Sequence, residues 1–194
     1  MAQSSAWDRQ RAAVREEIIQ TSRRLFLTHG FESTTIDEIV EVVGVSRRSF
    51  FRYFGTKEDV VLGDLVGRGE VIAAKLAERP AREDPWSAIR AAFHDSQETI
   101  MLDRESERAF GQMLFDTPSL RARFLEKRMR WQELLVPLIA LRLAPDGDLT
   151  GLRASAIVAS ALACLDAASE AWVAADEGVS LSDLYDEAVS AIRG

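Results

Sequence analysis

The chain has 194 residues, of which 47% are hydrophobic and 28% charged, as is typical of a folded globular protein rather than a disordered one. A single cysteine, Cys164, excludes an internal disulfide and a cysteine-based zinc site, and two histidines are too few for a histidine-rich metal centre, so we predict neither metal nor cofactor. The first residues are polar and charged, and the apolar runs are shorter than a membrane span, so we expect a cytoplasmic protein with no membrane partner.

The net charge of −7 argues at first against a nucleic-acid partner, but the charge is unevenly distributed. Residues 1–60 balance nine basic residues against nine acidic ones, whereas the remaining 134 residues carry 15 basic and 22 acidic residues. A neutral first third with clustered arginines permits specific DNA binding, because only indiscriminate coating of DNA needs a broad positive field.

Helical periodicity dominates and no convincing strand pattern is visible, so we predict an all-α protein of about nine helices. In the first part of the chain, Gly30 is a natural left-handed cap, Thr35–Glu38 is a capping box, and Gly44 ends the short helix that follows. Ser46 opens another helix, and Thr56 opens a longer one. The expected helices are about 9–29, 35–44, 46–54 and 56–79.

The clearest break in the chain is "RPAREDP" at 79–85, where Pro80 and Pro85 disfavour helix in the residues before them. Further along, Thr117–Pro118 is expected to cap a helix, with proline at the first helical position, and Pro137 is expected to kink that helix. The expected helices of this part are 86–103, 104–115, 118–143 and 149–175, with a final one capped by Ser180.

Two short helices separated by "VGVS" (43–46) are typical of a helix-turn-helix motif. Apolar positions that can lock the two helices together are Ile36, Ile39, Val43, Val45 and Phe50. The outer face of the second helix carries Arg47, Arg48, Ser49 and Arg52. The second helix of such a motif enters the major groove, where each bidentate arginine–guanine pair contributes about 1–3 kcal/mol of discrimination. The motif therefore predicts binding to double-stranded DNA, although arginines outside such a motif are most often a solvated helix face.

The segment "TTIDEIVEVVGVSRRSFFRYFGTKEDVV" resembles the DNA-binding region of TetR-family transcriptional repressors, and the resemblance covers about residues 12–65. It implies base or near-base contacts from Arg47, Arg48, Ser49 and Arg52. It implies phosphate contacts from Thr35, Ser46, Tyr53 and Lys57, with Phe50 and Phe54 in the core. The family usually has tyrosine at the position of Phe51, so either a nearby arginine replaces the tyrosine hydroxyl or one anchor is missing. For Lys57, at a helix start where the dipole disfavours a cation, a phosphate partner is an easier explanation than folding.

The resemblance further implies a DNA-binding domain at 1–60 and a ligand-binding and dimerisation domain at 61–194. We expect a homodimer on a palindromic operator, because one recognition helix contacts too few bases, with the alanine-rich helix 149–175 and the last helix at the interface. A small hydrophobic effector is expected to shift the helix at 57–79 and release the operator. "FFRYF", "MLFDTPSLRARFLEKRMRW" and "EAW" resemble a subgroup with regulators of mycofactocin and acyl-thioester metabolism, which favours an acyl thioester. Candidate pocket residues are Phe93, Met101, Phe110, Met113, Leu114, Trp131 and Trp172.

Several alternatives stay open. The candidate pocket residues are read first as core, although the same residue types also line apolar ligand pockets. Arg9, Arg11 and Arg15 are either surface charges or an arm that approaches phosphates or the minor groove. Asp166, in an otherwise apolar or small run, either faces solvent or is a buried carboxylate at an interface or pocket. No catalytic motif is recognisable, so we expect no enzyme. The remaining functional alternatives are a DNA-binding protein without a small-molecule effector and a small helical enzyme with a DNA-binding-like module.

Overall fold

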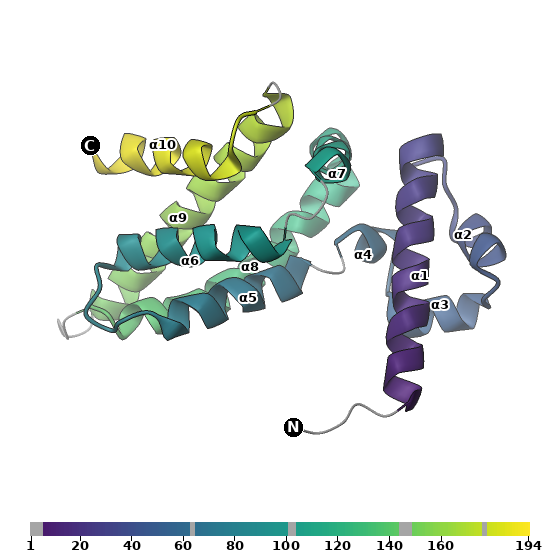
Figure 1. The fold of residues 1–194 in the computed structure, drawn as a ribbon, viewed down its shortest axis with the longest axis horizontal. Coiled ribbons are helices and arrows are strands. Elements are labelled where there is room, and N and C mark those ends of the chain that lie inside the picture. The colour runs from purple at the N-terminus through teal and green to yellow at the C-terminus, as the bar shows by residue number, and fades with distance from the viewer. Residues whose placement is uncertain (1–5, 63–64, 101–103, 144–148, 176–177) are drawn as a thin grey trace. The chain divides into compact units, whose positions relative to one another are not determined.

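The computed structural model describes residues 6–62, 65–100, 104–143, 149–175 and 178–194. Within these ranges all regular secondary structure is helical, which confirms the predicted all-α class. The chain divides into two compact units, unit 1 (residues 1–64) and unit 2 (residues 65–194) (Figure 1).

Ten helices are present in the described ranges. Unit 1 contains α1 (Ala6–His29), α2 (Ile36–Val43), α3 (Arg47–Tyr53) and α4 (Lys57–Leu62). Unit 2 contains α5 (Leu65–Glu78), α6 (Pro85–Ile100), α7 (Arg104–Asp116), α8 (Pro118–Ala140), α9 (Leu149–Ala174) and α10 (Leu181–Arg193). The predicted helix 56–79 corresponds to both α4 and α5, on either side of residues 63–64, which lie outside the described ranges, and this accounts for ten helices against about nine expected.

The core of unit 1 joins α1 to the two short helices that follow it. Ile18, Phe26, Ile39 and Phe50 are at most 2% exposed, so one side chain or more from each of α1, α2 and α3 is completely buried. Phe31 folds back over the end of α1, as its place after Gly30 predicts, with its ring centroid 5.2 Å from that of Phe26. This packing fixes the orientation of α3.

The helix starts in unit 1 differ in one respect from the sequence prediction. Thr35 caps α2 by accepting a hydrogen bond from the Glu38 amide at 3.1 Å, but the Glu38 carboxylate lies 2.8 Å from His29 Nδ1 at the end of α1. A reciprocal capping box is present instead at α4, where the Thr56 and Asp59 side chains each accept from the other residue's amide at 3.1 Å.

Unit 2 is built around α9, which packs against α8 and α10 and also contacts α6 and α7. The inward face of α9 alternates small and large buried residues, which lets neighbouring helices approach closely. Pro118 occupies the first helical position of α8 as predicted, but the Thr117 side chain forms no capping hydrogen bond, so only the proline part of that expected start is present.

Candidate nucleic-acid interface

The helix-turn-helix consists of α2, α3 and the turn between them. Gly44 ends α2 with φ of 76°, a left-handed conformation that glycine adopts without strain. Ser46 then caps α3 by accepting a hydrogen bond from the Ser49 amide at 3.1 Å. Phe50 and Phe54 are buried at 0% and 4% exposure, so the inner face of α3 is anchored and its opposite face is turned to solvent.

The exposed face of α3 carries the arginines that the sequence places there. Arg47 Nη1 donates to both carboxylate oxygens of Asp37 on α2 at 2.9 Å, an exposed pair that orients the guanidinium but adds little stability. Arg48 is exposed and forms no ion pair among the described side chains. Arg52 is exposed as well, so the three guanidinium groups give α3 a positive outer surface, although residues 1–60 as a whole carry equal numbers of basic and acidic residues.

At the end of α3, an arginine and two aromatic side chains lie together. The Arg52 guanidinium lies 5.1 Å from the centroid of the Tyr53 ring and donates to the Tyr53 hydroxyl at 3.4 Å. Phe51 is 47% exposed and meets Phe50 in a T-shaped, edge-to-face contact, with ring centroids 5.5 Å apart. Phe51 therefore presents an apolar ring on the outside of the motif, where the family resemblance leads us to expect a hydroxyl.

Hydroxyl groups at the two helix starts retain donors for a phosphate. The bond from the Glu38 amide uses a lone pair of the Thr35 oxygen, so the Thr35 hydroxyl proton is still available. Ser46 Oγ donates to Ser49 Oγ at 3.1 Å, so at the start of α3 it is the Ser49 hydroxyl proton that is still available. Both sites coincide with the positive end of a helix dipole, which favours an anion.

Lys57 has a folding role that the sequence analysis did not anticipate. Its ammonium donates to the carbonyl oxygens of Phe31 at 2.7 Å and Thr34 at 3.0 Å, and it lies 4.2 Å from the centroid of the Phe31 ring. The cation therefore fastens the start of α4 to the turn between α1 and α2. This tie explains a lysine at a helix start without any ligand, and a phosphate contact from Lys57 stays a prediction.

The candidate effector residues divide into three groups in unit 2. Phe93, Trp131 and Trp172 are buried within its continuous core at 3–4% exposure. Phe110, Met113 and Leu114, all on α7, are half-buried, and Met101 lies outside the described residues. Trp131 and Trp172 each donate their indole N–H to a backbone carbonyl, of Leu65 at 2.8 Å and Val179 at 3.1 Å respectively, so both tryptophans also bind segments of unit 2 together.

Unit 2 contains a buried charge that no sequence pattern indicates. Arg128 on α8 is 6% exposed, donates to the Leu162 carbonyl at 3.1 Å, and lies 2.8 Å from the half-buried Asp166 on α9. Burial lowers the pKa of Arg128 and raises the pKa of Asp166, because both charged forms are removed from water. Asp166 is thus a partly buried carboxylate rather than a solvated one. Arg128 carries no sequence signal, since it is one of many arginines in a charged stretch.

The fold and the arrangement of α2 and α3 define a helix-turn-helix DNA-binding protein. Residues 18–63 match the family described as bacterial regulatory proteins, tetR family, and residues 83–194 match the MftR C-terminal domain. The chain belongs to the TetR family of transcriptional regulators, with an MftR-like C-terminal domain, which confirms the resemblance noted from the sequence.

Similar proteins carry the names of regulators. The HTH-type transcriptional regulator TcmR of Streptomyces glaucescens is 32% identical over 187 residues, covering 92% of this chain and 82% of the relative. The mycofactocin biosynthesis transcriptional regulator MftR of Mycobacterium tuberculosis is 28% identical over 188 residues, covering 94% and 91%. At the level of the family, the chain is therefore a DNA-binding regulator rather than an enzyme.

Solved structures agree with this fold. The fatty acid degradation regulator FadR of Bacillus halodurans superposes with a TM-score of 0.60 at 19% identity, covering 93% of this chain and 94% of that protein. Thermus thermophilus FadR, a TetR-family repressor in complex with lauroyl-CoA, superposes with a TM-score of 0.57 at 24% identity, covering 92% and 93%. At these identities the likeness establishes the shared fold.

Proposed function

We propose that this TetR-family regulator is a repressor that binds a palindromic operator as a homodimer and is released by a small hydrophobic effector. The observation that carries the proposal is the exposed face of α3, where Arg47, Arg48 and Arg52 extend from a helix held in place by buried Phe50 and Phe54. Base or near-base contacts come from Arg47, Arg48, Ser49 and Arg52, and phosphate contacts come from Thr35, Ser46, Tyr53 and Lys57. A regulator of this kind works where the DNA lies, so a cytoplasmic location is part of the proposal.

Phe51 has a different part in this proposal. An exposed ring without a hydroxyl cannot donate to a phosphate, but an apolar side chain in the major groove can contact the methyl group of a thymine. The phosphate bond that the family tyrosine would supply falls instead to the neighbouring Arg52, whose guanidinium is exposed beside Tyr53.

The homodimer is supported by an apolar stripe on the outer face of α9. The residues at these positions are spaced three or four apart and are exposed: Leu152, Ala156, Ala159, Ala163, Ala167, Ala171 and Ala174. Among the described helices, α9 alone is long and apolar enough by composition to cross a membrane, but its inner face is occupied by the core of unit 2. A second copy of α9 packed on the stripe would cover this apolar surface, because small side chains allow two helices to approach closely.

The effector part of the proposal is a hydrophobic ligand in unit 2, with an acyl thioester as the preferred class. Its support is the apolar character of the candidate residues together with the MftR-like C-terminal domain. The candidate contacts are Phe93, Met101, Phe110, Met113, Leu114, Trp131 and Trp172. The effector releases the operator if it favours a dimer in which the spacing of the two recognition helices no longer fits the two half-sites. A coupling free energy of about 1–3 kcal/mol between effector binding and operator binding is enough.

The test begins with selection of bound duplexes from fragmented genomic DNA by the purified full-length protein. We expect a palindromic site, and we expect Arg48→Gln to weaken binding to it by about 1–3 kcal/mol per half-site and to relax its base preference. Arg24→Gln is the matched control, because Arg24 is an exposed arginine on α1, outside the helix-turn-helix. Affinities are measured by fluorescence anisotropy.

The same assay tests the effector. Lauroyl-CoA is the probe and coenzyme A alone is its control; we expect lauroyl-CoA to lower operator affinity by roughly 5–150-fold. Selection that yields no common sequence would refute the operator, whereas a site whose affinity no acyl thioester changes would favour a regulator without an acyl-thioester effector.

A further inference from the structure

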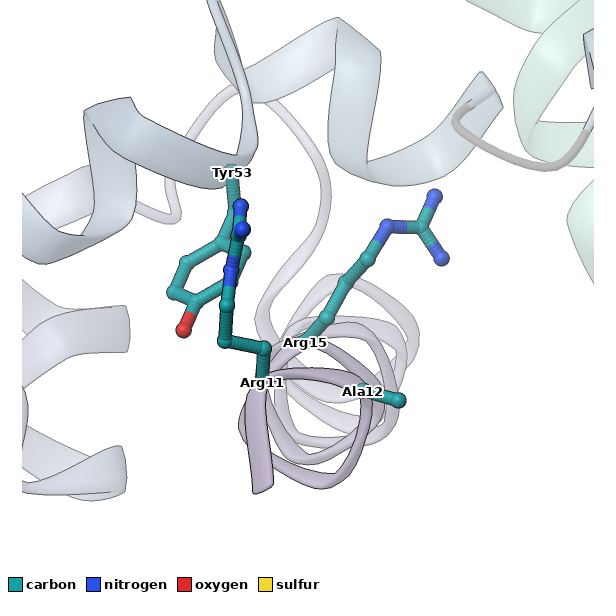
Figure 2. A pocket seen from close by; sticks show the side chains of 4 residues that line it. All are labelled: Arg11, Ala12, Arg15 and Tyr53. Carbon is teal, nitrogen blue, oxygen red and sulfur yellow. The ribbon is translucent and has the colours of Figure 1, made fainter. Parts of the chain in front are cut away.

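An open pocket in unit 1 lies between the first half of α1 and the end of α3. Arg11, Ala12 and Arg15 line it from α1, and Tyr53, the last residue of α3, lines it from the other side (Figure 2). In Figure 2 the Arg11 and Arg15 side chains extend from α1 into the space that Tyr53 lines from the other side. Ala12 contributes only a methyl group, so the space next to the arginines is not filled.

The two guanidinium groups in this pocket are positioned by aromatic rings rather than by carboxylates. Arg11 lies 4.7 Å from the centroid of the Trp7 ring, and Arg15 lies 5.3 Å from that of the buried Phe54. Neither guanidinium forms an ion pair among the described side chains, although the chain has 31 acidic residues against 24 basic ones. Stacking on a ring face leaves the N–H donors at the guanidinium edge unused.

A third donor completes the pocket. The Tyr53 hydroxyl accepts a hydrogen bond from Arg52 at 3.4 Å, which leaves its own proton to donate elsewhere. Two guanidinium groups and a hydroxyl form a site rich in donors, and planar guanidinium forks match the geometry of a phosphate.

We propose that the pocket formed by Arg11, Ala12, Arg15 and Tyr53 binds a phosphodiester group of the operator backbone. The proposal rests on the function proposed above and adds to it a phosphate site on α1, outside the helix-turn-helix itself. Its role is affinity without base preference, since backbone contacts fix the position of a protein on the duplex but do not read sequence.

The position of the pocket beside the last residue of α3 favours a DNA backbone phosphate over a free anion as the ligand. Helix α3 has seven residues and is therefore about 10 Å long, close to the major-groove width of about 12 Å. With the start of α3 directed at the bases, groups at its far end lie near the edge of the groove, where the backbone passes. The exposed Arg52 next to Tyr53 extends the same positive surface towards that edge.

The experiment measures affinity as a function of salt for the full-length protein on the selected operator and on a scrambled duplex of equal length. Each phosphate contact contributes about 0.9 to the slope of log affinity against log salt, or about a 3.5-fold change between 50 and 200 mM. We expect Arg11→Gln and Arg15→Gln each to reduce the slope by about 1 per bound subunit, with equal loss on both duplexes. Tyr53→Phe is expected to weaken both duplexes equally with little change in slope.

Two variants act as controls. Arg24→Gln removes the same charge from the same helix, and Arg24 lies nine residues, or about two and a half turns, beyond Arg15, on the opposite side of α1. It should leave the slope close to that of the wild type. Because Arg15 packs on Phe54, Arg15→Lys is included to keep the charge, and thermal unfolding followed by circular dichroism verifies that each variant is folded.

A second arm identifies the source of the phosphate. Neutral methylphosphonate linkages are placed one at a time along the operator, and one position in each half-site should weaken wild-type binding without weakening Arg15→Gln further. If the wild type still selects an operator but Arg11→Gln and Arg15→Gln have the same salt-dependence slope as Arg24→Gln, the pocket does not bind a phosphate. That result would leave the proposed function intact. The pocket would instead be a site for a free anion if calorimetry shows that inorganic phosphate binds and that Arg15→Gln abolishes this binding, while the salt-dependence slope for DNA is unchanged by the substitution. Failure to select any operator counts against both.

Discussion

Gly69 on α5 fits against Trp131 on α8 with no space for a larger residue. A Cβ at Gly69 would lie 2.3 Å from Trp131 Cδ1, well inside van der Waals contact. The indole is held in place by its bond to the Leu65 carbonyl and by the Arg128 guanidinium 4.3 Å from its ring centroid. Because the ring cannot move away easily, this glycine determines how closely α5 and α8 approach.

We therefore expect Gly69→Ala to lower the free energy of unfolding by about 1–3 kcal/mol, as overpacking of a core typically does. Gly151→Ala is the matched control, since Gly151 is an exposed residue within α9 with open space around its Cα. Alanine there should raise the free energy of unfolding by up to about 1 kcal/mol through helix propensity. Urea denaturation of both variants measures the difference, and equal effects in the two variants would contradict the close fit.

For single residues, the sequence predicts whether a side chain is buried better than it predicts which residue that side chain contacts. Phe50 was expected in the core and is buried, because its position follows from local helical periodicity. The partner of Lys57 is a carbonyl 26 residues away, and that of Arg128 lies 38 residues away on another helix. Contacts between distant segments depend on how the helices pack, which no local pattern records.

At the scale of elements, α6 is joined to α10 by a cluster of charged side chains. Arg90 on α6 donates two hydrogen bonds to Asp186 on α10, and His94, one turn further along α6, lies 3.2 Å from the same carboxylate. The hydrogen bonds from Arg90 hold the pKa of Asp186 below its ordinary value. The cluster thus links two helices that are distant in sequence, at the edge of unit 2.

This pair predicts a pH-dependent stability. A carboxylate whose folded-state pKa is lowered stabilises the fold above its unfolded pKa of about 3.9, and the contribution is lost as pH falls through the folded-state pKa. Asp186→Asn should therefore lower the free energy of unfolding at pH 7 by up to about 1 kcal/mol, since Arg90 is half exposed, and the difference from wild type should shrink below about pH 4. Glu187→Gln is the control on the same helix. A pH-independent difference would contradict the assignment.

Helix boundaries were predictable where a cap is local and less so elsewhere. Ser46 and Ser180 both cap the helices that the sequence assigns to them, because the bond joins a side chain to an amide two or three residues away. The expected end of α8 near Leu143 is three residues late, since α8 ends at Ala140 without a glycine stop. The candidate effector site was the hardest feature to predict from sequence, because the sequence pattern of a buried tryptophan such as Trp131 or Trp172 is the same in a core and in the wall of a pocket.

At the scale of the whole molecule, the uneven charge distribution matches the division into two units. The excess of acidic residues lies beyond residue 60, mostly in unit 2, while unit 1 carries the exposed arginines of α3 and the pocket on α1. A net acidic unit disfavours unspecific attachment to DNA, so we expect the binding energy to come from unit 1. In the proposed function, specificity depends on a dimer that presents two such motifs to one operator, so loss of the dimer should reduce operator binding.

The apolar stripe on α9 gives that test a definite site. Helix α9 has 26 residues and is about 39 Å long, and Ala163 lies near the middle of its exposed stripe. If two copies pair about a twofold axis through the stripe, Ala163→Glu places two like charges close together in an apolar interface, which both repulsion and desolvation disfavour. Light scattering should give twice 21.6 kDa for the wild type at micromolar concentration and about 21.6 kDa for this variant. Operator affinity should also fall in Ala163→Glu, although α3 is unchanged.

Ala74→Glu, at an exposed alanine of α5, should remain dimeric and bind DNA. A wild type that scatters as a monomer would refute the dimer, and a dimeric Ala163→Glu would move the interface away from α9.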